Sequence, residues 1–142
     1  VLHGGWRDAP PMRRSSDVMR PRLPEDCDRL FAEGVNAGDA DAVVALYEEG
    51  ACFVQREGVA IGPTAIRPVI VRMLAAKPRL TCNVRTVLRA GEDLALLYND
   101  WSLSSAGPDG QTVERTGKAL ELVRRQPDGT WRFVIDDPYG RE

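Results

Sequence analysis

A β-hairpin signal near the C-terminus constrains the fold of this chain more than any other feature. Residues 118–125 and 130–137 both alternate between apolar and polar side chains, and Asp128-Gly129 lies between them. An Asp-Gly pair flanked by two alternating runs is a typical hairpin turn. A two- or four-residue loop centred on this pair places Glu121 directly opposite Asp136.

The pairing of Glu121 with Asp136 is unusual for a sheet. Like charges at directly opposite positions destabilise antiparallel strands, so the pair indicates a functional site. The alternative is an odd-length loop, which would set Glu121 opposite residue 135 or 137 instead.

The hairpin ends a longer antiparallel meander. Its predicted strands span residues 79–90, 94–104, 111–125 and 130–137, with turn residues between them. A further strand is predicted earlier in the chain, at residues 51–55.

Three predicted helices precede the meander. Pro24 starts the first helix and Gly38 ends it. Asp39 caps a second, short helix that carries Tyr47 on its apolar side.

The third helix starts at Gly62-Pro63 and stops at Lys77-Pro78. Pro68 fits this helix only if it lies within about the first turn. Helices followed by a long antiparallel sheet predict an α+β fold in which the helices cover one sheet face.

Composition narrows the function classes. The chain of 142 residues fits one domain, and its hydrophobic fraction of 43% is ordinary for a soluble protein. The net charge of −2 favours neither nucleic acid nor an anionic membrane surface. There is no apolar run of the ~20 residues that a membrane span needs, and no signal-peptide pattern. We therefore expect a cytoplasmic protein.

The cysteines and the single histidine argue against metal chemistry. Cys27, Cys52 and Cys82 are widely spaced in apolar patterns, which suits reduced thiols in a core. His3 is the only histidine, which disfavours histidine-based catalysis and a zinc site. No glycine-rich phosphate loop is present, so we expect neither a metal nor a cofactor.

Residues 1–22 differ in composition from the rest of the chain. They contain Gly4-Gly5, Pro10-Pro11 and several arginines without periodicity, and so predict a flexible leader. A functional arm is the alternative. The folded domain is expected at residues 23–142.

Several segments resemble the SnoaL-like proteins of the nuclear transport factor 2-like superfamily. These segments are Val35–Asp39, Val44–Tyr47, Ala51–Val54, Gly62–Ile66 and Arg124–Gly140. The resemblance implies a cone-shaped α+β fold, in which helices and a curved sheet enclose one apolar cavity. It also implies a homodimer formed through the outer sheet face. Because the superfamily hosts both enzymes and binding domains, the resemblance is specific for the fold and not for a reaction.

Ketosteroid isomerase belongs to the same superfamily, and the resemblance retains only one of its three catalytic groups. The position of its aspartate base falls on Gln55, whose amide cannot accept a proton. The position of its tyrosine oxyanion donor falls on Phe31, and that of its protonated aspartate falls on Glu121. Steroid isomerisation is therefore not expected.

The same alignment, together with strand alternation, predicts which side chains face the cavity. They are Leu97, Asn99, Trp101, Ala119, Glu121, Val123, Val134 and Asp136. Glu121 and Asp136 are the predicted catalytic residues, and the others join Gln55 and Phe31 as predicted substrate-binding residues.

Two adjacent carboxyl groups in an apolar pocket suit acid–base catalysis. Burial and mutual repulsion raise the pKa of one, which leaves a neutral acid beside a base near pH 7. Asn99 or Gln55 could orient a substrate oxygen or a water. Trp101 could form a flat apolar wall for a ring-shaped ligand.

Each of these side chains also has a purely structural interpretation. Glu121 could reach solvent or bond Arg115 or Lys118. Asp136 could satisfy backbone donors near the chain end, and Trp101 could be a plain core residue.

Three functions remain open from the sequence. The first is a cofactor-free isomerase, cyclase or hydratase that uses Glu121 and Asp136 on a small apolar or aromatic molecule. In a hydrolase variant the pair activates a water, and Arg115 is the only loose candidate for the arginine that epoxide hydrolases of the superfamily use. The second is a non-catalytic binding protein for such a molecule. The third is a dimerisation domain with a vestigial pocket.

Overall fold

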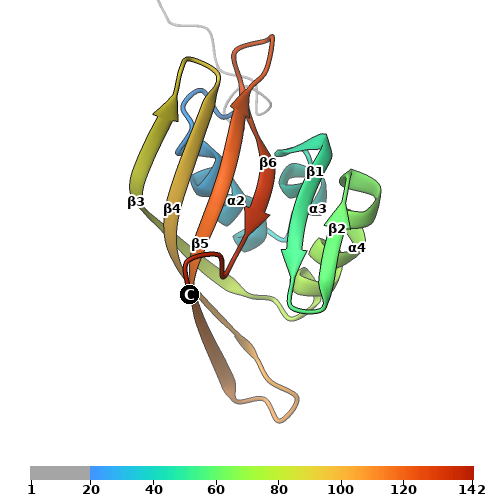
Figure 1. Ribbon diagram of the computed structural model, residues 1–142. Coiled ribbons are helices and arrows are strands. Elements are labelled where there is room, and N and C mark those ends of the chain that lie inside the picture. The colour runs from blue at the N-terminus through green and yellow to red at the C-terminus, as the bar shows by residue number, and fades with distance from the viewer. Residues whose placement is uncertain (1–19) are drawn as a thin grey trace, which may run out of the picture.

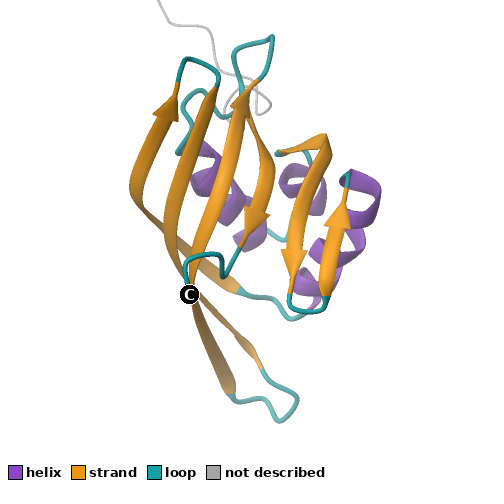
Figure 2. Cartoon of the chain, viewed as in Figure 1, coloured by secondary structure: helices purple, strands orange, loops and turns teal. Residues whose placement is uncertain are grey.

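Three helices lie against one face of a six-stranded sheet in the computed structural model, which describes residues 20–142 (Figure 1, Figure 2). The helices are α2 (Asp26–Asn36), α3 (Ala40–Val44) and α4 (Pro63–Ala75). The strands are β1 (Tyr47–Gln55), β2 (Gly58–Ile61), β3 (Arg79–Ala90), β4 (Leu94–Ala106), β5 (Thr112–Arg125) and β6 (Trp131–Asp137). The predicted α+β class is confirmed. The face that the helices cover is termed the inner face below, and the opposite one the outer face.

The sheet is open and mostly antiparallel. Its order is β2-β1-β6-β5-β4-β3, and β1 pairs with β6 in parallel while the other pairs are antiparallel. Strands β3 to β6 form the predicted meander. The short edge strand β2 was not predicted, since it holds only four residues directly before the Gly62 turn.

The prediction that Tyr47 lies on the second helix is wrong. Helix α3 ends at Val44, and Tyr47 is the first residue of β1, where it pairs with Phe133. The N–H of Phe133 donates to the carbonyl of Leu46 at 2.7 Å. The local spacing of Val43, Val44 and Tyr47 fits a helix, but pairing with the distant strand β6 decides the conformation.

The β5–β6 hairpin pairs Glu121 with Asp136, as predicted, but by an unpredicted route. Arg125 pairs with Trp131, so the loop between them holds five residues, an odd number. A β-bulge at Val134 then adds one residue to β6, and beyond it Glu121 lies opposite Asp136. The bulge compensates the odd loop and restores the register.

The same bulge corrects one predicted cavity residue. Val134 is the extra residue of the bulge, is half-buried, and does not line the pocket described below. Phe133 takes its place on the inner face and is 1% exposed. Ile135, on the outer face, is 42% exposed. Simple alternation fails here because a bulge breaks the period of two.

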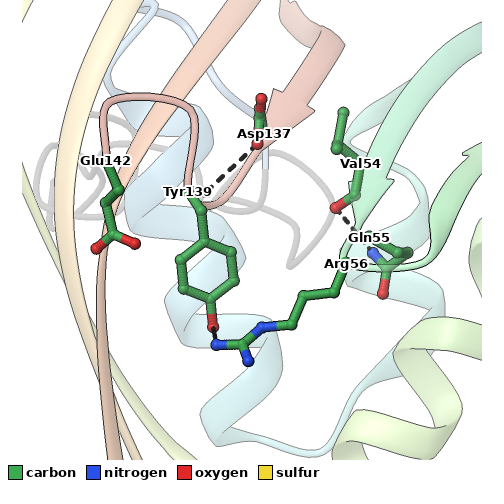
Figure 3. A pocket seen from close by; sticks show the side chains of 6 residues that line it. All are labelled: Val54, Gln55, Arg56, Asp137, Tyr139 and Glu142. Carbon is green, nitrogen blue, oxygen red and sulfur yellow. Dashed lines mark hydrogen bonds between the residues drawn. The ribbon is translucent and has the colours of Figure 1, made fainter.

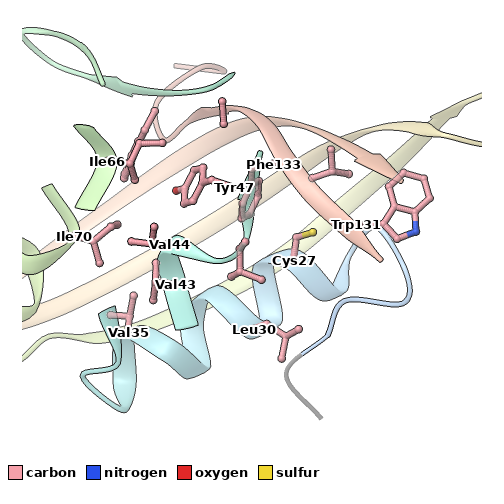
Figure 4. Close-up of a cluster of buried hydrophobic side chains, with 14 of the residues drawn as sticks. Cys27, Leu30, Val35, Val43, Val44, Tyr47, Ile66, Ile70, Trp131 and Phe133 are labelled. Carbon is pink, nitrogen blue, oxygen red and sulfur yellow. The ribbon is translucent and has the colours of Figure 1, made fainter. Parts of the chain in front are cut away.

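A hydrophobic core fills the space between the inner face and the helices (Figure 4). Its largest fully buried side chains from the sheet strands include Tyr47, Trp131 and Phe133, and the helices contribute Leu30, Ile66 and Ile70. The ring of Tyr47 lies 5.1 Å from that of Phe133 between centroids, in a tilted arrangement. Burial of each such side chain stabilises the fold by roughly 1.5–3 kcal/mol.

Helix α4 begins and ends near the predicted turns but carries its proline deeper than predicted. Pro68 is the sixth residue of the helix and so lies in its second turn. Pro68 has no N–H, so the carbonyl of Thr64 lacks its helical hydrogen-bond donor. Both residues are exposed, so water can replace that donor. Gly62 precedes the helix with φ 82°, and a Cβ there would lie 2.9 Å from the carbonyl oxygen of Glu49, so glycine is required.

The predicted leader falls mostly outside the described residues, because residues 1–19 are not among them. At its end, Pro21 is buried and its carbonyl accepts the N–H of Trp131 at 3.0 Å. Within residues 20–142, no helix is long and apolar enough to cross a membrane.

Candidate active site

A pocket of about 870 Å³ opens between the inner face and helices α2 and α4. Seven of the predicted site residues line it, and they are Phe31, Gln55, Asn99, Trp101, Ala119, Glu121 and Asp136. Leu97 and Val123, also predicted to face the cavity, are fully buried in the core and do not line it. They have the inward orientation but lie nearer the other end of their strands, where core side chains fill the space.

Three carboxyl groups, not two, meet at this pocket. Glu121 is 4% exposed and Asp136 is 5% exposed, and Asp28 of α2 joins them at 2%. Asp28 is not among the predicted site residues. The signal was present, since Asp28 precedes Phe31 by three residues and Val35 by seven and so lies on the apolar side of its helix.

The hydrogen bonds around Glu121 determine where its proton lies. The backbone N–H of Asn83 donates to Asn99 Oδ1 at 3.0 Å, so the other amide atom of Asn99 must be the NH₂ group. This group donates to Glu121 Oε2 at 3.3 Å. Glu121 therefore accepts on Oε2, and a proton on this residue belongs on Oε1.

Asp28 is the carboxyl neighbour of Glu121. Asp28 Oδ2 and Glu121 Oε1 are both buried without a hydrogen-bond partner among the described residues. The pKa of each carboxyl group depends on the other, so the two lie close together. Two ionised carboxylates would leave both atoms without a donor, whereas a proton on Glu121 Oε1 would supply one.

Asp136 has a different partner. The phenol of Tyr47 donates to Asp136 Oδ2 at 2.6 Å, and both side chains are buried. Among the described residues, no other hydrogen bond reaches this carboxyl group, which leaves Oδ1 without a donor on the pocket wall. Asp136 therefore does not cap the chain end, the structural role considered from the sequence.

The environment shifts the pKa of all three acids upward. Burial raises the pKa of Asp136 to about 7, with the hydrogen bond from Tyr47 acting in the opposite direction. Burial also raises the pKa of Glu121 well above its ordinary value, and the charge and hydrogen bond of Asp28 add to this. Burial raises the pKa of Asp28 as well. Among residues 20–142, no salt bridge reaches any of the three.

Two thiols and one buried phenol near the pocket are neutral. Burial raises the pKa of the Cys82 thiol to about 12, and that of the Cys27 thiol well above its ordinary value. Burial and the neighbouring Asp136 also raise the pKa of Tyr47. Neither cysteine is a thiolate nucleophile at neutral pH, so proton transfer by carboxyl groups is the chemistry that the pocket offers.

Trp101 was interpreted from the sequence either as a pocket wall or as a core residue, and it has features of both. It lines the pocket, and its indole N–H also donates to the carbonyl of Pro138 at 2.8 Å. The ring packs edge-on against Tyr139 and lies directly over Gly117, where a Cβ would come within 2.4 Å. Trp101 is thus a pocket wall that also fastens the segment after β6.

A smaller pocket of about 340 Å³ lies beside the mouth of the large one (Figure 3). Both are lined by Gln55, Arg56 and Tyr139. Gln55 donates to the carbonyl of Val54 at 3.1 Å. Within residues 20–142, no group of three or more His, Cys, Asp or Glu side chains is arranged to bind a metal ion.

The SnoaL-like domain family matches residues 28–139, the segment that forms the sheet, the helices and the pocket. The chain belongs to this family. A comparison with curated proteins found no match.

Solved structures of other proteins share the SnoaL-like fold at low sequence identity. A ketosteroid isomerase-like protein from Erwinia carotovora is 16% identical, with a TM-score of 0.70, over 80% of this chain and 90% of that one. A nuclear transport factor 2-like protein with a cystatin-like fold from Novosphingobium aromaticivorans is 22% identical, with a TM-score of 0.67, over 78% and 75%. A proposed dehydratase of the same superfamily from Streptomyces avermitilis is 18% identical, with a TM-score of 0.65, over 80% and 95%. At these identities the likeness establishes the fold alone.

Proposed function

We propose that this SnoaL-like protein is a cofactor-free acid–base enzyme that moves protons on a small apolar or ring-containing substrate. The observation that supports this most is the set of three buried carboxyl groups that line one pocket without a cationic partner. Burying such groups costs stability, because burial disfavours their charged forms. A protein that needed only a fold would have apolar side chains there.

Asp136 is the base of the proposed reaction. With a pKa of about 7 it is partly ionised at neutral pH, which suits a group that must accept a proton and return it. Tyr47 donates to one carboxylate oxygen, which fixes the side chain and leaves Oδ1 to meet the substrate.

Glu121 is the proposed acid. It carries a proton on Oε1, and a substrate oxygen that takes the place of Asp28 would accept this proton. Asn99, fixed by the backbone of Asn83, keeps the Glu121 carboxyl group oriented. Isomerisation, cyclisation and hydration all need such a donor and base on opposite ends of one reacting unit.

The apolar lining supports a hydrophobic substrate. Phe31, Phe53, Phe133, Trp101, Val69 and Met73 line the pocket around the carboxyl groups. Steroid isomerisation of the ketosteroid isomerase type is not proposed, since Gln55 and Phe31 occupy the positions of its base and its tyrosine. The hydrolase variant is not favoured, because Arg115 lies at the exposed edge of the pocket and forms no ion pair with any of the three carboxyl groups.

Deuterium exchange tests the proposal without a known substrate. A panel of cyclic ketones and enones is incubated in D₂O with the protein, and NMR follows exchange at the carbon next to the carbonyl. We expect exchange with the wild type, a ~100-fold or larger loss in Asp136→Asn, and unchanged thermal stabilisation of that variant by the ligand. Asp137→Asn, the neighbouring residue on β6, is the matched control and should keep wild-type exchange.

Titration of the carboxyl carbons decides between the enzyme and a binding protein. If Glu121 and Asp136 titrate near the ordinary value of about 4 and no panel member exchanges, the acid–base proposal is wrong. Thermal stabilisation by panel members would then identify a non-catalytic binding protein, and its absence a dimerisation domain.

We also propose a homodimer that forms through the outer face. One row of apolar side chains crosses all six strands there, with each residue paired to the next, and it contains Ile61, Cys52, Ile135, Leu122, Leu96 and Leu88. Ile61, Ile135 and Leu88 are 63%, 42% and 48% exposed. Cys52, Leu96 and Leu122 are half-buried, and a continuous apolar row of this kind favours an interaction surface. Sedimentation of Leu122→Glu, expected to be monomeric, tests this.

The reduced thiols of Cys27, Cys52 and Cys82 are the basis for proposing a cytoplasmic location.

A further inference from the structure

Three arginines surround the mouth of the large pocket. Arg56 comes from the turn between β1 and β2, Arg72 from α4 and Arg115 from β5, so they approach from three different elements. All three side chains are exposed, and Glu57 is the one acidic residue that lines the pocket beside them. Among the exposed charged residues that line the large pocket, three arginines and one glutamate give a net charge of +2, while Asp137 and Glu142 line the smaller pocket beside it.

None of these arginines is used by the fold in an ion pair. Among residues 20–142, no carboxylate lies within 4.0 Å of Arg56, Arg72 or Arg115, whereas six other arginines of the same part of the chain are ion-paired. Arg56 donates to the hydroxyl of Tyr139 at 3.4 Å, and its guanidinium group lies 4.9 Å from the ring centroid (Figure 3). Tyr139 positions this charge at the mouth and does not neutralise it.

The pocket thus has two chemically different ends. The inner end is apolar and holds Asp28, Glu121 and Asp136, which repel an anion. The mouth carries guanidinium groups, whose planar donors suit carboxylate, phosphate or sulfonate oxygens. A molecule that fits both ends has a neutral apolar body and one anionic group.

We infer that the substrate is an amphipathic anion, whose acidic group binds Arg56, Arg72 and Arg115 at the mouth while its ring or apolar chain reaches the three carboxyl groups. This inference rests on the proposed function for the reacting end and names the substrate class of the same pocket. The arginines then act in binding and orientation, and the carboxyl groups in proton transfer.

Two fluorescent probes that differ in one group test the inference. 8-Anilinonaphthalene-1-sulfonate is an aromatic anion, and N-phenyl-1-naphthylamine is the same ring system without the sulfonate. The measured quantity is the ratio of their Kd values in the wild type and in arginine variants. An exposed ion pair of this kind changes affinity about threefold, so Arg72→Gln/Arg115→Gln should weaken the anion about tenfold and the neutral probe less than twofold.

A matched control and salt dependence sharpen the experiment. Arg67 lies on α4 with Arg72 but is paired with Asp41 outside the pocket, at 2.6 Å, so Arg67→Gln should leave the ratio unchanged. Raising NaCl from about 50 to about 500 mM should weaken only the anionic probe.

The outcomes separate this inference from the proposed function. An unchanged ratio in the double arginine variant, salt-independent binding of the anion, or no binding of either probe to the wild type overturns the inference. If the wild type prefers the anionic probe because of its arginines but catalyses no deuterium exchange, the proposed enzyme activity is wrong. The inferred preference for an anion then still holds.

Discussion

The two faces of the sheet treat the same residue type in opposite ways. Asp100, on the outer face, accepts hydrogen bonds from Arg141 at 2.6 Å and from Arg85 at 3.1 Å. The hydrogen bond from Arg141, with the help of Arg85, lowers the pKa of Asp100. Asp136, on the inner face, has a phenol for a partner and a raised pKa. Successive side chains of a strand point to opposite faces of the sheet. The face to which an aspartate points therefore decides whether its charged form is supported.

This difference separates acids that hold a fold together from acids that cost it stability. On the outer face a guanidinium group and solvent support the charged form. On the inner face burial removes solvent, and neighbouring acids oppose ionisation further. Buried carboxyl groups that lower the stability of the fold indicate a function. Substitutions on the two faces should therefore have different effects.

The largest difference is expected from packing. Phe133→Ala removes a fully buried ring on the inner face and should lower the free energy of unfolding by about 3–5 kcal/mol. Ile135→Ala, two residues along on the outer face, should cost less than about 1 kcal/mol at concentrations at which the proposed dimer is dissociated. Urea denaturation measures both. A cost for Ile135→Ala that grows with protein concentration would place the outer face in an interface.

The second difference lies in the pH dependence of stability. The pKa of Asp136 is about 7 in the folded protein and near 4 in the unfolded chain. The stabilisation by its protonated form is therefore complete below about pH 4 and is lost as the pH rises through about 7. Between pH 5 and 7 the wild type should lose about 2 kcal/mol more than Asp136→Asn, at up to about 1.4 kcal/mol per pH unit and with a smaller slope close to pH 7.

Denaturant titration at several pH values checks this slope. Asp109→Asn, in the exposed turn between β4 and β5, is the control and should follow the wild type. Equal slopes for the wild type and Asp136→Asn would show that Asp136 is ionised in the fold like an ordinary surface acid.

A smaller effect is expected from the hydrogen bond inside the pocket. The phenol of Tyr47 holds the pKa of Asp136 below the value that burial alone would give. Tyr47→Phe should therefore raise that pKa by about one unit, the worth of one such hydrogen bond. Carbon-13 NMR of the carboxyl group measures it. Tyr98→Phe on the outer face, where Arg141 lies over the ring, should leave the pKa of Asp136 unchanged.

The smallest effect is expected at Asp100. Its ion pairs with Arg85 and Arg141 lie near solvent, so Asp100→Asn should change the Tm only slightly. Thermal melts at low salt and at about 0.5 M NaCl test this, and the difference from the wild type should shrink in salt. A large, salt-independent loss would mean that the outer face is covered by another surface.

Much of the fold followed from local patterns. The capping side chain of Asp39 accepts the N–H of Ala42 at 3.1 Å, as predicted for the second helix. The strands of the meander begin and end within about two residues of their predicted limits, because alternation is a local property of the chain. Strand β2 and the start of β1 escaped prediction, since their conformation depends on pairing with distant residues.

The candidate site was predictable in part. Glu121 and Asp136 were paired correctly, although a five-residue loop and the bulge at Val134 produced the register. Asp28 and Tyr47 were missed as site residues. Each comes from an element outside the meander, and the register of a hairpin does not predict where such an element packs on the sheet.

The sequence by itself determined the element types, the α+β class and the two-residue spacing that turns Glu121 and Asp136 inward. These properties depend on side chains within a few residues of one another. Only the tertiary structure decided that Phe133 replaces Val134, that Asp28 lies beside Glu121, that Tyr47 binds Asp136, and that Arg56, Arg72 and Arg115 line one pocket. Those relations join residues far apart in the chain, and packing of the helices and β1 on the sheet is the physical cause that brings them together.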